Sequence, residues 1–298
     1  MLQTMNIPKI MEDELFATYL DRLAESNGFI STNKFLMNIL GEQSCSQYIK
    51  SNSAVLYRNE SVFVSICSFL NINQKDILHI FQHSFIYPGI SPFMNGSRQS
   101  AYIQSLFFSN VENRKKLIGV YQPQSYELRY CSECAAEEIE SLGFMYFHTE
   151  NQLPGVRICP KHKKLLLTTG KINHDNYDHI NMKGFIECQP NADVVTMCDY
   201  SNAAFSIYNS WPDTDFANIR LCISRKMLQQ GYLINRSKKD SIQSVIHQGR
   251  FEQIASNVEP LYHSTNDFLY PSGIPAYIAI ILMLFKSMDE FIKAVFAQ

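Results

Sequence analysis

Three cysteines and one histidine are spaced so that together they could bind one metal ion. Cys131 and Cys134 stand three positions apart, and Cys159 and His162 repeat this spacing after a gap of twenty-four residues. Thiolate and imidazole are ligands that Zn²⁺ favours, and four of them complete its tetrahedron. Because four protein ligands leave no open position, the sequence predicts a structural Cys3His zinc site and not a catalytic one.

Two other interpretations of these residues are open. The four groups could be unrelated thiols and an imidazole in a reduced core. They could also belong to a catalytic zinc site, because His148-Thr149-Glu150 matches the H-x-E of zinc deaminases, but no P-C-x-x-C follows it. The sequence contains no HExxH, Walker loop or G-x-S-x-G motif. We therefore predict no enzymatic activity, and a packing role for His148.

Basic side chains gather in two acid-free stretches, although the formal net charge of the chain is −2. Residues 151–174 and 216–239 contain no Asp or Glu, whereas the N-terminal stretch 12–25 is acidic. Such local fields attract a polyanion more than the total charge does, although each stretch could also be an ordinary solvated face. The candidate nucleic-acid contacts are Lys161, Lys163, Lys164, Arg225, Lys226, Arg236, Lys238 and Lys239.

The remaining cysteines and the apolar stretches indicate a protein of the cytoplasm. The chain opens without the apolar run of a signal peptide, so the eight cysteines are not expected to form disulfides. We expect Cys45, Cys67, Cys188 and Cys222 to be buried free thiols. The longest apolar run, residues 274–285, is shorter than the roughly 20 residues that cross a bilayer, and it predicts a buried helix.

Helical periodicity dominates the elements that must position these residues. Acids in the first turn of the first helix would suit its dipole. Residues 85–94 are expected to form a packed connector, and residues 174–199 loops with a strand near 182–187. Helices are expected at residues 12–25, 31–40, 61–70, 73–82, 135–142, 216–230, 240–248 and 272–285, with one more after a capping box at 287–290.

The predicted fold is mainly α, with helical bundles that flank a central Cys3His zinc-finger segment. Helix-turn-helix-like units are expected at residues 61–82 and around residues 231–239. The predicted division is an N-terminal helical domain at 1–125, a zinc-binding segment at 126–170 and a C-terminal helical domain at 171–298.

Four stretches of the chain together resemble one known family. They read MEDELFATYLDRLAESNGF with KFLMNIL, FIYPGISPFM, RYCSECAAEE with LPGVRICPKHKKLL, and PAYIAIILMLFKSMDEFIKAV. They resemble, in order, the start, the aromatic connector, the zinc motif and a later helical segment of the TniQ/TnsD family of bacterial transposition target selectors. The resemblance covers most of the chain, and its specific part is the metal motif.

The chain departs from the family pattern without losing a metal ligand. Ser132 stands where the family usually has proline, and Lys163 stands where glycine usually follows the histidine. Many TniQ members have a second CxxC pair, but Cys188 and Cys198 are ten positions apart, so we assign no second zinc. This difference favours the TnsD-like branch of the family.

The resemblance implies a function without catalysis. It implies that the protein binds target DNA, or docks on an RNA-guided CRISPR effector as in CRISPR-associated transposons, and then recruits a AAA+ transposition regulator of the TnsC/TniB kind. Residues 1–52 are the candidate surface for this regulator, because their acidic charge would suit a basic partner. The resemblance also implies a bacterial, cytoplasmic protein.

Two other functions are compatible with the same residues. The protein could be a stand-alone zinc-containing DNA-binding regulator, or a pure protein adaptor that never touches DNA. The sequence also leaves the oligomeric state open, a homodimer included.

Overall fold

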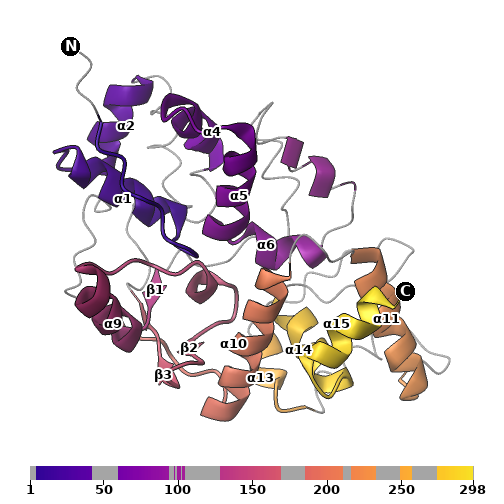
Figure 1. Cartoon of the computed structure of the whole chain (residues 1–298). Coiled ribbons are helices and arrows are strands. Elements are labelled where there is room, and N and C mark those ends of the chain that lie inside the picture. Colours follow the sequence, from indigo (N-terminus) through magenta and orange to yellow (C-terminus); the bar gives the residue numbers. More distant parts are fainter. Residues whose placement is uncertain are drawn as a thin grey trace.

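The computed structural model describes residues 5–41, 60–93, 97, 99–101, 103–104, 128–168, 185–210, 216–232, 249–256 and 274–297. Within these ranges the chain is mainly helical, as the sequence predicts, with short strands around the cysteine motif. Figure 1 shows the N-terminal helices together, α9 and the strands below them, and the C-terminal helices beside both groups.

The N-terminal helices enclose a group of aromatic side chains. Phe16 lies edge-on to Phe63 at 4.8 Å and stacks on Phe85 at 5.2 Å between ring centroids. Ser31 and Asn73 cap the following helices, as their positions predict, by accepting from the backbone N–H three residues later. The elements are α1 (Phe16–Ser26), α2 (Thr32–Leu40), α4 (Glu60–Phe69), α5 (Gln74–Ser84), α6 (Tyr87–Ile90) and the 3-10 turn η1 (Ser91–Phe93).

The predicted start of the first helix is wrong by four residues. α1 begins at Phe16, and no acid lies in its first turn. The preceding backbone is instead tied to the segment before η3: Leu15 N–H donates to the Phe147 carbonyl at 2.8 Å, and Thr149 N–H donates to the Asp13 carbonyl at 2.8 Å. Asp13 adopts φ 61°, a left-handed conformation that ends any regular helix there. Asp13 and Glu14 therefore form ion pairs, with His148 and Arg22, and do not serve the helix dipole.

Two small antiparallel sheets carry the cysteine motif. The first has the strand order β1-β4-β5, and in the second β2 pairs with β3 so that Cys159 lies opposite Lys164. α9 begins three residues before the predicted position and ends, as predicted, at Gly143 with φ 81°. The elements are β1 (Arg129–Tyr130), α9 (Ser132–Leu142), the 3-10 turn η3 (Glu150–Gln152), β2 (Ile158–Cys159), β3 (Lys164–Leu165), β4 (Leu167–Thr168) and β5 (Ile186–Glu187).

Helix α10 (Val194–Asn209) contradicts the loop predicted for the end of residues 174–199. It packs against α6, β2 and α14, and thus joins all three parts of the chain. The hydroxyl of buried Tyr200 donates to the Pro154 carbonyl at 2.7 Å, and that of Tyr208 donates to the His83 carbonyl at 2.7 Å. A Cβ at Gly155, which has φ 83°, would lie 2.6 Å from the Tyr200 hydroxyl oxygen. This contact requires glycine there.

The C-terminal helices form the remaining side of the core. α14 (Ile274–Leu284) is buried over almost its whole circumference, as the apolar run predicts. Ser287 caps α15 (Met288–Phe296) by accepting from Glu290 N–H at 3.1 Å. α11 (Phe216–Gln229) packs against α14 and α15, and the short α13 (Glu252–Ser256) packs against α14. The helix predicted at residues 240–248 lies outside the described residues.

The main buried apolar cluster includes residues of the N-terminal helices, the cysteine motif and the C-terminal helices, and a smaller one contains Ile158, Met197 and Cys198. The connector at residues 85–93 is packed and buried, as predicted. Cys67, Cys188 and Cys222 are buried free thiols, as expected, whereas Cys45 lies outside the described residues. Both predicted domain boundaries also fall outside the described residues, so the division into three domains stays a prediction.

Candidate metal centre

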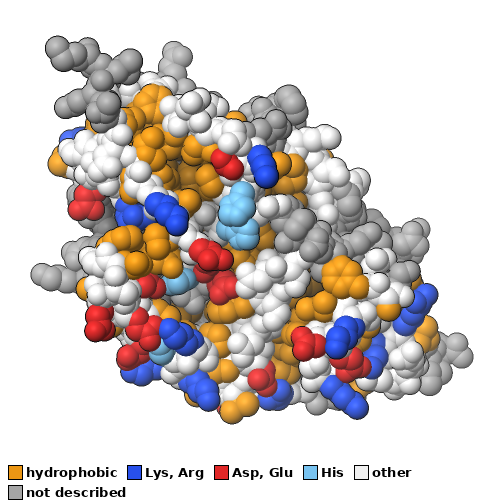
Figure 2. Space-filling view, in the orientation of Figure 1, with side chains coloured by type: hydrophobic (Ala, Val, Ile, Leu, Met, Phe, Trp, Pro, Cys, Tyr) orange, Lys and Arg blue, Asp and Glu red, His pale blue; other side chains and the backbone are white. Residues whose placement is uncertain are grey.

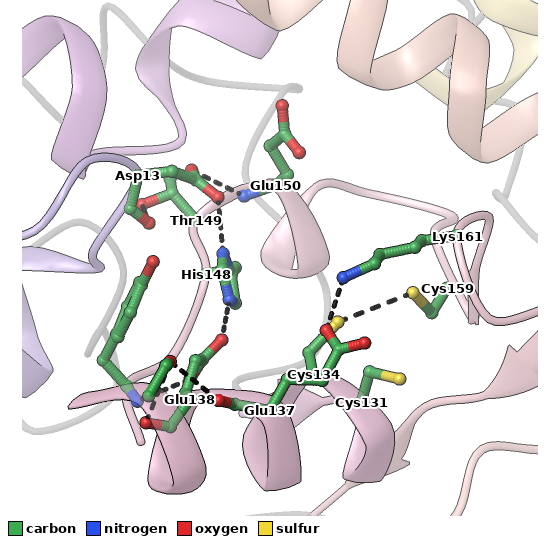
Figure 3. A network of polar contacts seen from close by, with 12 residues as sticks. Asp13, Cys131, Cys134, Glu137, Glu138, His148, Thr149, Glu150, Cys159 and Lys161 are labelled. Carbon is green, nitrogen blue, oxygen red and sulfur yellow. Dashed lines mark hydrogen bonds and ion pairs between the residues drawn. The ribbon is translucent and has the colours of Figure 1, made fainter. Parts of the chain in front are cut away.

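The four predicted ligands come together at one point. Their sulfur and nitrogen atoms all lie within 4.8 Å of one another. The Nδ1 atom of His162 lies 3.4 Å from the sulfurs of Cys131 and Cys134 and 3.7 Å from that of Cys159, and the sulfurs of Cys134 and Cys159 are 3.9 Å apart. Figure 3 shows Cys131, Cys134 and Cys159 beside each other at the end of α9.

These separations fit a tetrahedral ion. With metal–sulfur bonds of about 2.3 Å and metal–nitrogen bonds of about 2.0 Å, a tetrahedron places two sulfurs about 3.8 Å apart and sulfur and nitrogen about 3.5 Å apart. The observed distances are close to both values. The group is therefore positioned to bind a metal ion with four protein ligands, which leaves no place for a substrate.

Helix α9 supplies the first two ligands. Cys131 is its N-cap residue and Cys134 lies in its first turn, so their x2 spacing comes from a helix start and not from an isolated tight turn. The partial positive charge of a helix N-terminus favours the thiolate form that a metal requires.

The β2–β3 turn supplies the other two ligands. It is closed by Lys163 N–H, which donates to the Cys159 carbonyl at 2.7 Å, and Lys163 itself has φ 55°. Glycine adopts this conformation without strain. The turn thus accounts for the glycine that the family resemblance leads us to expect after the histidine; with lysine there, the four ligand atoms still lie within 4.8 Å of one another.

Carboxylates on α9 surround the metal ligands. The Nε2 atom of His162 lies 3.2 Å from a Glu137 carboxylate oxygen, the kind of contact that orients a metal-bound imidazole. Glu137 also accepts from Lys161, and Glu133, one turn earlier, accepts from Lys164. The hydrogen bond that Lys161 donates to Glu137 raises the pKa of this lysine. Two of the three lysines beside the site are therefore paired with acids of the same segment.

The sequence predicts a packing role for His148. In the structure this side chain also forms an ionic bridge. Its Nδ1 atom lies 3.2 Å from Asp13, and its Nε2 atom lies 2.6 Å from Glu138 of α9. Burial by itself would lower the pKa of His148, but hydrogen bonds and charges from both acids raise it to about 10. The imidazolium thus ties the segment before α1 to the metal-binding helix (Figure 3).

Of the other predicted nucleic-acid contacts, the structure describes Arg225 and Lys226, both on α11. Lys226 donates to Glu290 at 2.7 Å, and Arg225 is exposed on the same helix, α11. Figure 2 shows Lys and Arg side chains interspersed with Asp and Glu on the visible face, and not gathered into one basic area. Arg236, Lys238 and Lys239 lie outside the described residues, and so does the second helix-turn-helix candidate beyond residue 232.

The acids of this network are the functional candidates that sequence reasoning missed. Glu133 and Glu137 are four positions apart, a spacing that places them on one helix face, but no local pattern pairs them with Lys161 and Lys164. No local signal identifies Asp13 and His148, which lie 135 positions apart in the sequence.

The family of this chain follows from its sequence once the site is known. Among the described residues, no helix is long and apolar enough to pass through a bilayer. A search of curated proteins found no match. The sequence model of the TniQ family matches residues 6–166, which include the N-terminal helices and all four metal ligands. The chain belongs to the TniQ family, and it is therefore a transposition-associated protein.

Proposed function

We propose that this protein selects target sites for transposition. It marks an insertion site, by binding target DNA or by docking on an RNA-guided CRISPR effector, and recruits a AAA+ transposition regulator without doing chemistry itself. The match to the TniQ family over residues 6–166 carries the proposal. A four-ligand metal group, with no open coordination position, supports a structural and non-catalytic role.

Within this proposal the metal is zinc. A Cys3His donor set is one of the combinations that structural zinc sites use. When bound, zinc would supply folding free energy, and the four ligands would fix the end of α9 against the β2–β3 turn. Among the described residues no second group of three or more metal-binding side chains accompanies it. This supports the TnsD-like branch.

The basic residues are compatible with two modes of target recognition, direct DNA binding and docking on another protein or ribonucleoprotein. Lys163 is exposed, and within the described part of the chain it forms no ion pair with a carboxylate. With Lys164, Arg225 and Lys226 it is a candidate phosphate contact. The pairing of Lys161 and Lys164 with acids of α9 favours a second candidate function, an adaptor that docks on protein or ribonucleoprotein and never contacts DNA.

Two assays test the proposal together. The full chain, immobilised, should retain a AAA+ transposition regulator from the same transposon, and replacing the exposed Glu12 by Lys, which leaves the buried face of α1 intact, should weaken the retention. Gel shifts with candidate and random duplexes, run at two stated salt concentrations, separate direct DNA binding from the adaptor function. If the regulator is not retained, target selection is refuted; if it is retained without any gel shift, the adaptor function stands.

A further inference from the structure

A cavity of about 290 Å³ lies between α1, the beginning of α2 and the segment that leads to His148. Its wall includes Glu14, Asp21, Glu25, Arg22, Phe29 and Tyr146. Small-molecule pockets in proteins usually span about 300–1,000 Å³. A cavity at the lower limit holds one side chain and not a larger ligand.

The one basic residue in the wall is already neutralised. Arg22 donates from Nε and Nη2 to the two carboxylate oxygens of the fully buried Glu14, at 2.7 and 2.6 Å, and from Nη2 to the Lys9 carbonyl at 2.9 Å. Its guanidinium also lies 4.5 Å from the centre of the Phe144 ring. Arg22 is thus committed to Glu14, whose charge balances its own, and is a poor anchor for an anion.

The N-terminus of α2 is occupied as well. Asp21 accepts a hydrogen bond from the hydroxyl of Thr32, the first residue of α2, and so brings a negative charge to this end of the helix. Glu25 is exposed in the last turn of α1, and no Lys or Arg among the described residues forms an ion pair with it. Among the described residues of the wall, Glu25 thus carries a charge that no Lys or Arg balances, which disfavours a phosphate or carboxylate beside it.

Tyr146 lies on another segment of the cavity wall, near a different set of acids. Burial, first, and then the charges of Glu138, Asp13, Glu14 and Glu12 raise the pKa of this tyrosine to about 12. Tyr146 and Phe29 present aromatic surface to the cavity, and Ile30 is 64 % exposed at its edge. Figure 2 shows apolar side chains gathered over the N-terminal helices.

We propose that this cavity receives an arginine side chain presented by a protein partner. A guanidinium is planar, so it can stack on Tyr146 or Phe29 while its N–H groups bond to the carboxylates of Asp21 and Glu25. The apolar edge at Ile30 contacts the neighbouring residues of the partner. The proposal requires neither DNA binding nor transposition, so it stands or falls separately from the proposed function.

The test uses the full chain and a capped peptide, acetyl-Gly-Arg-Gly-amide, followed by NMR amide shifts. We expect a dissociation constant on the order of 1 mM and shifts confined to residues 21–32 and 145–147. The citrulline peptide, which is isosteric but uncharged, should bind at least about tenfold more weakly. Free arginine should also bind more weakly, because its own carboxylate is repelled by Glu25.

Two variants test the assignment to the cavity. Glu25→Gln should weaken the arginine peptide by about threefold to tenfold, and Glu25→Lys should abolish its binding. A lysine in the last turn of a helix suits the dipole, so a folding defect does not explain this loss. The control Asp289→Asn removes an exposed carboxylate from α15, which Figure 1 shows at the other end of the molecule, and should bind normally. Equal binding of the citrulline peptide, shifts elsewhere, or equal affinity of Glu25→Gln and the control overturns the proposal.

Discussion

The ionic bridge of His148 supports a prediction about folding stability. The imidazolium is 24 % exposed, and its partners Asp13 and Glu138 are 19 % and 12 % exposed, so the three charges are only weakly solvated. Raising the pKa of His148 from 6.5 to about 10 corresponds at pH 7 to about 4 kcal/mol in favour of the folded state. Burial raises the pKa of Asp13 from 3.8 to about 7, which opposes it by about 4 kcal/mol at pH 7.

The two opposing shifts determine what each substitution should do. At pH 7 the two shifts nearly cancel, whereas removing only the histidine leaves two weakly solvated carboxylates without a cation. We therefore expect His148→Gln to lower the free energy of unfolding by about 2–4 kcal/mol. Adding Asp13→Asn, which tolerates the left-handed backbone at this position, should recover at least about 1 kcal/mol.

Urea unfolding of the metal-loaded protein at pH 7 measures all four members of this cycle. Glu140→Gln, an exposed carboxylate on the same helix, is the control and should change stability by less than about 0.5 kcal/mol. Additive effects of the two substitutions, within about 0.5 kcal/mol, would show that His148 and Asp13 do not interact and would refute the bridge.

Further predictions concern pH, the metal, the central helix and the lysines. Because the pKa of His148 is raised in the folded state, the stabilisation that it provides is complete below about pH 6.5 and is lost as pH rises toward 10. The difference in unfolding free energy between wild type and His148→Gln should therefore shrink over this range. A constant difference contradicts the assignment. Cys131→Ala should abolish zinc binding, measured as metal content of the purified chain, and lower the soluble yield; unchanged zinc content contradicts the ligand set. Gly155→Ala should cost about 2–4 kcal/mol in thermal or urea unfolding, because its Cβ meets the Tyr200 hydroxyl; a neutral effect would mean that α10 can move away. Replacing Lys163 and Lys164 by Ala should weaken any duplex binding and reduce its dependence on salt by about 2 in slope; an unchanged slope shows that they do not contact phosphates.

The sequence by itself determined the parts of this protein that depend on local chemistry. The spacing of Cys131, Cys134, Cys159 and His162 indicated one metal site, because ligand type and short-range spacing are properties of the chain. The caps at Ser31, Asn73 and Ser287 and the buried run of α14 were likewise readable, since a capping side chain bonds within its own turn.

Only the tertiary structure decided the features that join distant segments. α10 was missed because its sequence, rich in β-branched and polar residues, has weak helical propensity, and its contacts with α6, β2 and α14 stabilise it instead. Asp13 lies outside helix α1 and pairs with His148, and Lys161 pairs with Glu137. Such ion pairs form between groups that only the folded chain brings close. Charge counted along the chain cannot show which acid lies opposite which base, and therefore it could not reveal how little of the basic charge beside the metal remains unpaired.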